Sequence, residues 1–199
     1  VMLISEDLMR EWRFKLIKAL AFIHKKSSLT NAKFQDYYET RHAPLAKSLL
    51  TFESYERNYM DPILISPIED LGSISIFKYS SEEALGILAE QMMSDTGDTL
   101  RNDELNFMNV PLNFYVFTNS IEDISLTHNR KIFYIAKDHD QLTRLDRENG
   151  IEKISENLIV DNNDMIGIPE YGISQTMKFK DLEIIAKKFP GLIFSNSVT

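Results

Sequence analysis

The sequence predicts an α+β protein in which two tandem ferredoxin-like βαββαβ units form one barrel. Two observations lead to this fold class. The order strand, helix, strand, strand, helix, strand can be followed twice along the 199 residues, the second time in a shorter form. In addition, YVFTNSI at residues 115–121 resembles LIFSNSV at residues 192–198, and each segment ends one unit. Such self-similarity at the same place in two units suggests an internal duplication.

The barrel is expected because a four-stranded sheet with helices on one face leaves its other face bare. Two such sheets in one chain can pack face to face and cover each other. We therefore expect an intrachain, pseudo-dimeric α+β barrel in a monomer or, at most, a weak homodimer. Residues 1–122 would form the first unit with a helical extension at its start, and residues 123–199 a shorter, degenerate repeat.

The first unit is expected to open with a short amphipathic helix over residues 6–12 and a buried strand over residues 14–23, where apolar residues predominate. Thr30 or Asn31 can cap the next helix by accepting a hydrogen bond from its free N–H groups. Pro44 marks a break or a re-start of that helix. The later elements are expected as strands over residues 51–59, 73–79 and 113–118, helices over residues 82–92 and 99–107, and a loop at residues 95–98.

The second unit is expected to repeat this order. Residues 138–156 are predicted to be mainly helical, although Gly150 interrupts them. Pro190 and Gly191 would end the last helix. The other elements are expected as strands over residues 131–136, 172–179 and 192–194, an extended stretch from residue 158 and a helix over residues 181–189.

Composition excludes several classes of function. The formal net charge of −8 argues against a nucleic-acid partner, because binding to phosphates requires a basic face. Cysteine is absent, which excludes a disulfide framework, a thiolate metal site and a cysteine nucleophile. No apolar run approaches the roughly 18 residues of a membrane span, and the N-terminus lacks the basic region of a signal peptide. We therefore expect a cytoplasmic protein without a membrane partner.

Neither a metal nor a cofactor is expected. The histidines do not stand at the spacing of a zinc site, and the DNND segment at residues 161–164 lacks the ligand spacing and the glycine of a calcium loop. No phosphate-binding loop or dinucleotide fingerprint is present in the sequence. Haem binding is not excluded by the sequence, because a haem ligand requires only one histidine in an apolar pocket.

His42 is the leading candidate for catalysis, because an imidazole can accept or donate a proton near neutral pH. It lies at the edge of the apolar stripe of its helix, which would place it at the mouth of a pocket. The alternative is a structural histidine that hydrogen-bonds the backbone near Pro44. At about 100° per residue, the stripe itself consists of Phe34, Tyr37, Tyr38, Arg41 and Leu45.

The candidate ligand-binding residues lie on this helix and on the following strand. Tyr37 and Tyr55 would orient a ligand through their hydroxyl groups, and Asn58 would add a polar contact. Ordinary aromatic core is the alternative for each tyrosine. Arg41 can contact an anionic ligand or, as we prefer, pair with Glu56. The full set of expected ligand-binding residues is Phe34, Tyr37, Tyr38, Arg41, Tyr55, Asn58 and Tyr59.

The segment FQDYYETRHAPL at residues 34–45 resembles the first helix of the EthD-like family, which has the form F-x-x-Y-(W/Y)-x-x-x-H-A-P-L. YERNY at residues 55–59 is similar to the Y-x-x-N segment of that family. The resemblance covers roughly residues 14–120 and implies the dimeric α+β barrel superfamily. The second unit has no H-A-P-L, so the resemblance implies one pocket per chain.

The resemblance also implies a range of functions rather than one. EthD-like members include an accessory protein of ether degradation and enzymes that act on aromatic polyketide-like compounds, and related barrels include cofactor-free monooxygenases, isomerases, cyclases and haem proteins. We expect this chain to bind a small apolar or aromatic compound in the barrel cleft. It would act as a cofactor-independent oxidoreductase or as a proton-transfer catalyst of the cyclase, dehydratase or isomerase type. The alternative is a non-catalytic binding or accessory protein of a pathway, because the fold does not fix the reaction.

Overall fold

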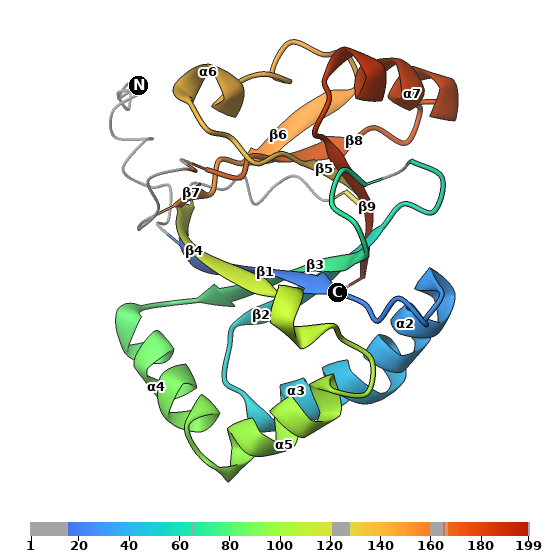
Figure 1. Cartoon of the computed structure of the whole chain (residues 1–199). Coiled ribbons are helices and arrows are strands. Elements are labelled where there is room, and N and C mark those ends of the chain that lie inside the picture. The colour runs from blue at the N-terminus through green and yellow to red at the C-terminus, as the bar shows by residue number, and fades with distance from the viewer. Residues whose placement is uncertain (1–15, 65, 121–127, 160–164, 166, 199) are drawn as a thin grey trace, which may run out of the picture.

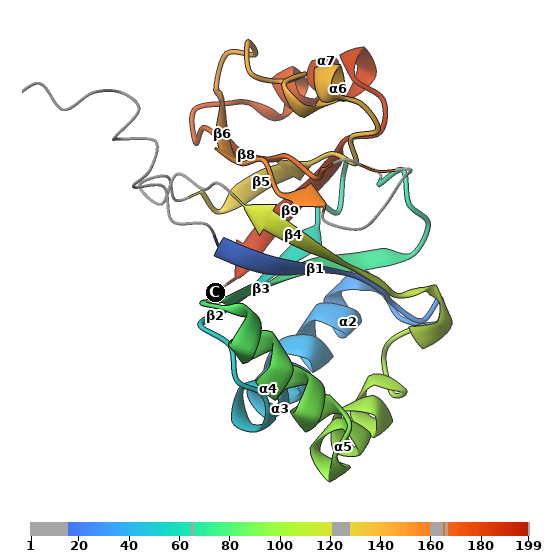
Figure 2. The ribbon, with the colours of Figure 1, turned by 90° about the vertical axis from the view of Figure 1, so that its left-hand side faces the viewer.

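The computed structural model describes residues 16–64, 66–120, 128–159, 165 and 167–198. The helix expected over residues 6–12, the turn expected at residues 161–164 and the expected boundary between the two units at residues 122 and 123 lie outside the described residues. The strands curve so that two halves of one sheet face each other, and the helices cover the outer faces of the two halves (Figure 1). The view turned by 90° shows the same order of layers (Figure 2).

The first unit has the predicted βαββαβ order, with two helical turns added. Thr30 caps its first helix by accepting a hydrogen bond from the N–H of Lys33, and Ser81 caps α4 through the N–H of Ala84. The elements are β1 (Leu16–His24), α2 (Asn31–Tyr37), the π-helical turn η1 (Tyr38–His42), α3 (Ala43–Leu49), β2 (Ser54–Met60), β3 (Leu71–Tyr79), α4 (Glu82–Met92), α5 (Asp95–Glu104), the 3-10 turn η2 (Val110–Leu112) and β4 (Phe114–Ser120).

The loop expected at residues 95–98 is wrong, because α5 already begins at Asp95. Ser94 caps this helix by accepting a hydrogen bond from the N–H of Thr96. Gly97 is buried at the start of α5, where a Cβ atom would collide with the carbonyl oxygen of Met92. The glycine therefore permits the close approach of α4 and α5 rather than marking a loop.

The second unit is shorter and contains less helix than expected. Its elements are β5 (Arg130–Phe133), α6 (His139–Leu142), β6 (Ile151–Ser155), β7 (Leu158–Ile159), β8 (Glu170–Ile173), α7 (Phe179–Lys188) and β9 (Ile193–Val198). The mainly helical segment predicted over residues 138–156 is wrong. Only one turn of helix forms there, and the end of the segment is strand β6, which pairs with β8.

The described strands form one nine-stranded sheet in the order β6-β8-β5-β9-β2-β3-β1-β4-β7. Each unit places its fourth strand beside its first, then its third and second, which is the ferredoxin-like order. β9 joins the units by pairing with β2, where Met60 lies opposite Ser195. At the other side β7 pairs with β4, and β7 follows β6 after only residues 156 and 157. Both units thus contribute to one sheet within one chain, and a two-residue link joins its edge strands β6 and β7.

Asn157 forms the corner between β6 and β7. Its φ of 47° is in the left-handed region, which asparagine adopts more readily than most residues. Its side-chain oxygen accepts hydrogen bonds from Ser120 on β4 and Ser155 on β6, at 2.6 and 2.7 Å. Its amide group donates to the carbonyl oxygen of Ile168. One buried side chain therefore connects both units at this seam of the barrel.

Side chains inside the barrel are apolar in one part and charged in another. Lys131 donates to Glu56 and Glu170, both at 2.6 Å, and Lys18 lies 3.5 Å from Glu170. These groups come from β1 and β2 of the first unit and β5 and β8 of the second. Burial raises the pKa of Glu170, but Lys18 and Lys131 outweigh burial and lower it to about 2. The apolar part consists mainly of Leu20, Phe22, Ile74, Ile76, Phe133 and Ile193.

Candidate functional site

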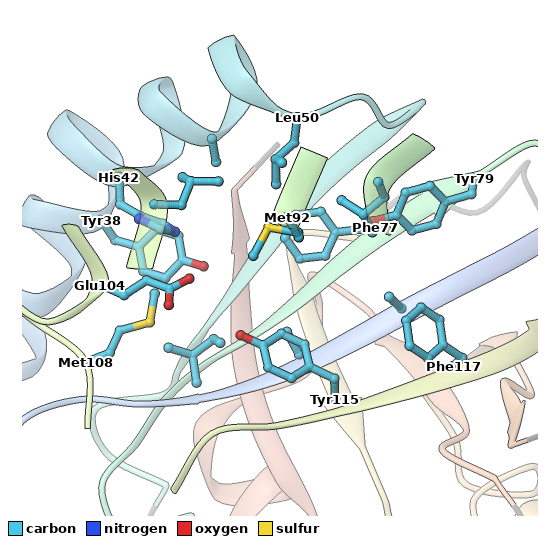
Figure 3. A pocket seen from close by; sticks show the side chains of 16 residues that line it. Tyr38, His42, Leu50, Phe77, Tyr79, Met92, Glu104, Met108, Tyr115 and Phe117 are labelled. Carbon is cyan, nitrogen blue, oxygen red and sulfur yellow. The ribbon is translucent and has the colours of Figure 1, made fainter. Parts of the chain in front are cut away.

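A cavity of about 190 Å³ lies between the sheet of the first unit and its covering helices (Figure 3). Most of its lining is aliphatic or aromatic. Its lining includes Tyr115 and Phe117 of β4, which stay about half exposed. The lining residues are Ala19, Ala21, Ile23, Tyr38, His42, Ala46, Leu50, Phe77, Tyr79, Leu88, Met92, Leu100, Glu104, Met108, Tyr115 and Phe117.

The cavity exists because three of the residues that line it are alanines, whose side chains are too small to fill the space between sheet and helices. Ala19 and Ala21 point outward from β1, and Ala46 faces them from α3. Helix α4 has no buried residue, and its Leu88 and Met92 reach the cavity only half buried. Helix α4 therefore covers a hollow there, whereas the other helices of this layer pack on the sheet through buried side chains such as Phe34 and Leu100.

A π-helical turn aims His42 at this cavity. Within η1 the N–H of Ala43 bonds to the carbonyl oxygen of Tyr38, five residues earlier. Such a turn holds one extra residue, so later side chains are displaced by about 100° around the helix. His42 thereby takes the inward place and is 5% exposed, whereas Arg41 is exposed. The prediction that Arg41 belongs to the apolar stripe is wrong for this reason.

Asp103 on α5 holds the imidazole of His42. The Nδ1 atom of His42 lies 2.8 Å from Oδ2 of Asp103, and the hydroxyl of Tyr37 donates to Oδ1 at the same distance. We assign the proton of the neutral ring to Nδ1, because a carboxylate accepts a hydrogen bond there. Burial lowers the pKa of His42, while Asp103 opposes this effect. Nε2 is then an unprotonated base near neutral pH.

Glu104 follows Asp103 and lines the cavity. Burial raises the pKa of its carboxyl to about 7; Arg101 lowers this pKa and Asp103 raises it further. Glu104 is also the last residue of α5, and the negative end of a helix dipole disfavours a carboxylate. A substantial share of this carboxyl is therefore protonated at neutral pH.

The structure brings only two of the predicted site residues to the cavity, Tyr38 and His42. The hydroxyl of Tyr38 accepts a hydrogen bond from Tyr55 and lies 3.0 Å from Ser75, so its ring rather than its hydroxyl group faces the hollow. Burial raises the pKa of Tyr38 to about 12, while Ser75 and Tyr55 oppose this effect. Tyr38 thus forms a wall that stays neutral.

The other predicted ligand contacts have structural partners. Phe34 packs against Tyr38 and Phe107, and Tyr37 reaches the site only through Asp103. Tyr59 donates to Glu39, which also binds Arg57. These partners lie on the helix side of β2, where they join α2 and η1 to the sheet.

Asn58 and Glu56, for which polar roles are expected, lie on the other face of the sheet. Asn58 points to the barrel interior, where its amide donates to the carbonyl oxygen of Ile74 and its oxygen accepts from Ser197. Glu56 also faces the barrel interior and binds Lys131 rather than Arg41. Alternate residues of a strand point to opposite faces, so neither side chain can reach the cavity on the other side of β2.

Three further residues at the site, Asp103, Glu104 and Tyr115, are not marked as candidates by any pattern in the sequence. They lie over sixty residues from His42, and no local motif joins them to the H-A-P-L segment. Neighbouring residues of a helix project in directions about 100° apart. Asp103 can therefore bind His42 while Glu104 faces the cavity, but helix spacing alone does not show which residue does which. Among the described residues there is no group of acidic or histidine side chains that could hold a metal ion. The described helices also include none that is long and apolar enough to cross a membrane.

Residues 26–110 match the family model of the EthD domain. No curated protein matches the chain. An anthrone oxidase-like protein of known structure has a TM-score of 0.55 and 8% identity, covering 94% of this chain and 92% of that one. For chlorite dismutase from Candidatus Nitrospira defluvii the TM-score is 0.51 and the identity 8%, covering 98% and 96%. An EthD-family protein from Bacillus halodurans has 20% identity over 51% of this chain and 95% of that one, with a TM-score of 0.37. At such identities the first two likenesses show the α+β barrel fold alone.

Proposed function

Because this chain carries an EthD domain on an α+β barrel, we propose that it binds a small uncharged apolar compound and transfers a proton to or from it through His42. One observation carries the proposal. The imidazole of His42 is held by Asp103 in the wall of an apolar cavity, with Nε2 left as a base. The proposed reaction is cofactor-independent.

The size and lining of the cavity support a ligand of one or two rings. An engineered protein cavity of about 150 Å³ binds benzene, and the present one is somewhat larger, at about 190 Å³. Its aromatic and aliphatic walls favour an apolar ligand. The lining residues that the structure describes include no lysine or arginine, so an anionic group would be buried among them without the countercharge of such a side chain. This favours an uncharged aromatic or oxygenated compound.

The Asp103–His42 pair supports proton transfer. A carboxylate that fixes the Nδ1 tautomer orients the ring and stabilises the imidazolium that forms when Nε2 takes a proton. Tyr37 acts as a positioning residue, because its hydroxyl binds the other oxygen of Asp103. Abstraction of a proton beside a carbonyl group is common to isomerisation, cyclisation, dehydration and cofactor-free oxidation. The proposal therefore covers these reaction types.

We also propose that the active form is a monomer whose two repeats divide near residue 122. The pairing of β9 with β2 and of β7 with β4 supports this, because each joins the units within one chain. Sedimentation equilibrium should give a mass near the 23.1 kDa of one chain. An obligate dimer at micromolar concentration would contradict the proposal.

The proposed catalysis is tested with 2-indanone, a neutral bicyclic ketone with acidic hydrogens beside its carbonyl. Proton NMR in D₂O measures both its binding and the exchange of those hydrogens. The wild type should bind it and accelerate exchange, whereas His42→Ala should bind it and lose about 10²- to 10⁴-fold in rate. Lys47→Ala, on the exposed side of α3, serves as the matched control. Binding without exchange by the wild type would support the accessory-protein alternative and overturn catalysis.

A further inference from the structure

Two groups that can exchange protons line the same end of the cavity from different elements. His42 comes from η1 and Glu104 from the end of α5, and Figure 3 shows both among the lining side chains. Their proximity follows from the chain, because Asp103, which binds His42, directly precedes Glu104. A ligand in the cavity therefore meets both groups.

The carboxyl of Glu104 is not engaged elsewhere. In the part of the chain that the structure describes, it has no hydrogen bond and no ion pair of its own, in contrast to Asp103. Its charged surroundings are Arg101 and Asp103 on α5, and the neutral phenols of Tyr38 and Tyr115 face it from η1 and β4. Burial and the helix end favour its protonated form, which can donate a hydrogen bond to a ligand.

We propose that Glu104 is the catalytic acid that acts together with His42 at this end of the cavity, and that the substrates are uncharged carbonyl compounds with a hydrogen on the adjacent carbon. This inference rests on the proposed function and extends it. Nε2 of His42 takes the proton from the carbon, the C–H electron pair forms the C=C bond, and the carbonyl π pair takes the proton of Glu104. The products are an enol, an imidazolium and a carboxylate, and reversal of the step returns both protons.

The missing countercharge supports this substrate class. An enolate would be a buried anion in a cavity without lysine or arginine, which is costly. Protonation of the developing oxyanion by Glu104 moves the negative charge to the Glu104 carboxylate, which is a much weaker base than an enolate oxygen and lies at the end of α5 near Arg101. A substrate with its own carboxylate would also raise the pKa of Glu104 through like-charge repulsion and would bind poorly.

The test compares Glu104→Gln and Glu104→Leu with Glu90→Gln, an exposed carboxylate on α4. The readout is 2-indanone exchange in D₂O over a pH series from about 5 to about 9. The wild-type rate should rise as His42 loses its proton and fall again near pH 7 as Glu104 ionises. The exchange rate of Glu104→Leu should be about 10²-fold lower than that of the wild type. The rate of Glu104→Gln should be only about 10-fold lower, because its amide still donates a hydrogen bond, and its pH profile should lack the fall near pH 7, because an amide does not ionise. Glu90→Gln should behave as the wild type.

The outcomes separate this inference from the proposed function. If His42→Ala loses exchange while both Glu104 variants keep the wild-type rate and pH profile, the role of Glu104 is overturned and that of His42 stands. If the wild type does not exchange 2-indanone, both are overturned. The isosteric Glu104→Gln keeps the test decisive should Glu104→Leu fold poorly. The restriction to uncharged substrates is tested with indane-2-carboxylate, which should not compete with 2-indanone for binding. Competition equal to that of a neutral indane would overturn this restriction.

Discussion

The two units share one topology but differ in the layer between sheet and helices. In the first unit this layer contains the cavity, with Ala19, Ala21 and Ala46 around it. In the second unit the corresponding layer is filled by a continuous apolar cluster, including Leu142, Leu145, Ile132, Tyr171, Leu182, Ile185 and Phe194. The same arrangement of strands and helices can thus support a binding site or a packed core, depending on side-chain size.

The polar groups of the two layers differ in the same way. The hydroxyl of Tyr171 in the second unit donates its proton to Asp146 at 2.8 Å and also lies 3.0 Å from the carbonyl oxygen of Leu142, so it holds the end of α6 and the segment after it. In the first unit, by contrast, Nε2 of His42 and the carboxyl group of Glu104 are left for a ligand in the cavity. The difference teaches that the repeat provides the scaffold, while, among the residues that the structure describes, the layer of the first unit leaves polar groups for a ligand.

The largest expected effect concerns the ion network that both units share. Glu170→Ala should lower the free energy of unfolding by about 3–5 kcal/mol. The substitution removes a buried carboxylate that contacts the ammonium groups of Lys131 and Lys18, and both lysines stay buried. Urea unfolding at neutral pH measures this change. The pKa of Glu170 is lowered in the folded state, so its contribution is complete above the unfolded pKa near 4.5 and is lost as the pH falls toward 2. A change below about 1 kcal/mol would contradict the role of the network.

Matched enlargements of one alanine in each layer should sharpen the comparison. Ala136→Leu places extra carbon atoms in the filled second unit and should cost about 1–3 kcal/mol. Ala46→Leu extends into the cavity and should cost less than about 1 kcal/mol, while binding of 2-indanone is lost. Thermal unfolding and ligand-observed NMR measure the two effects. Equal destabilisation by both variants would show that the first unit is packed as tightly as the second.

A smaller effect is expected from the charge of Glu104. Its pKa is raised in the folded state to about 7, so its ionisation destabilises the fold progressively as the pH rises from about 4.5 to 7. Glu104→Gln removes this penalty and should stabilise the protein by about 1–2 kcal/mol above pH 7 and by little at pH 4, because partial exposure screens the charge. Unfolding in urea at both pH values checks this. The same gain at both pH values would contradict a raised pKa.

The sequence predicted the scaffold better than the site. The order of elements and the similarity of residues 115–121 and 192–198 are properties of the chain itself, and β4 and β9 occupy equivalent places in the structure. The predicted helix over residues 138–156 is wrong, because the strand β6 within it is stabilised by pairing with the distant β8. Tertiary contacts of this kind outweigh local propensity.

At the site, the π-helical turn η1 is the reason why the predicted and observed positions of Arg41 and His42 differ. Regular helix geometry placed Arg41 inside and His42 at the edge, and the π-helical turn reversed the two. Asp103 and Glu104 could not be assigned, because their role depends on the packing of α5 against η1. The H-A-P-L motif therefore identified His42 as the candidate but neither its carboxylate partner nor the cavity in front of it.

The most direct test of the central claim uses methionine methyl groups as reporters in each region. Met92 and Met108 line the cavity, Met60 lies inside the barrel and Met177 packs against the core of the second unit. In the spectrum of protein labelled with ¹³C at the methionine methyl groups, addition of 2-indanone should shift the signals of Met92 and Met108 and leave those of Met60 and Met177 in place. Shifts at Met60 or Met177 without shifts at Met92 and Met108 would contradict a binding site confined to the first unit.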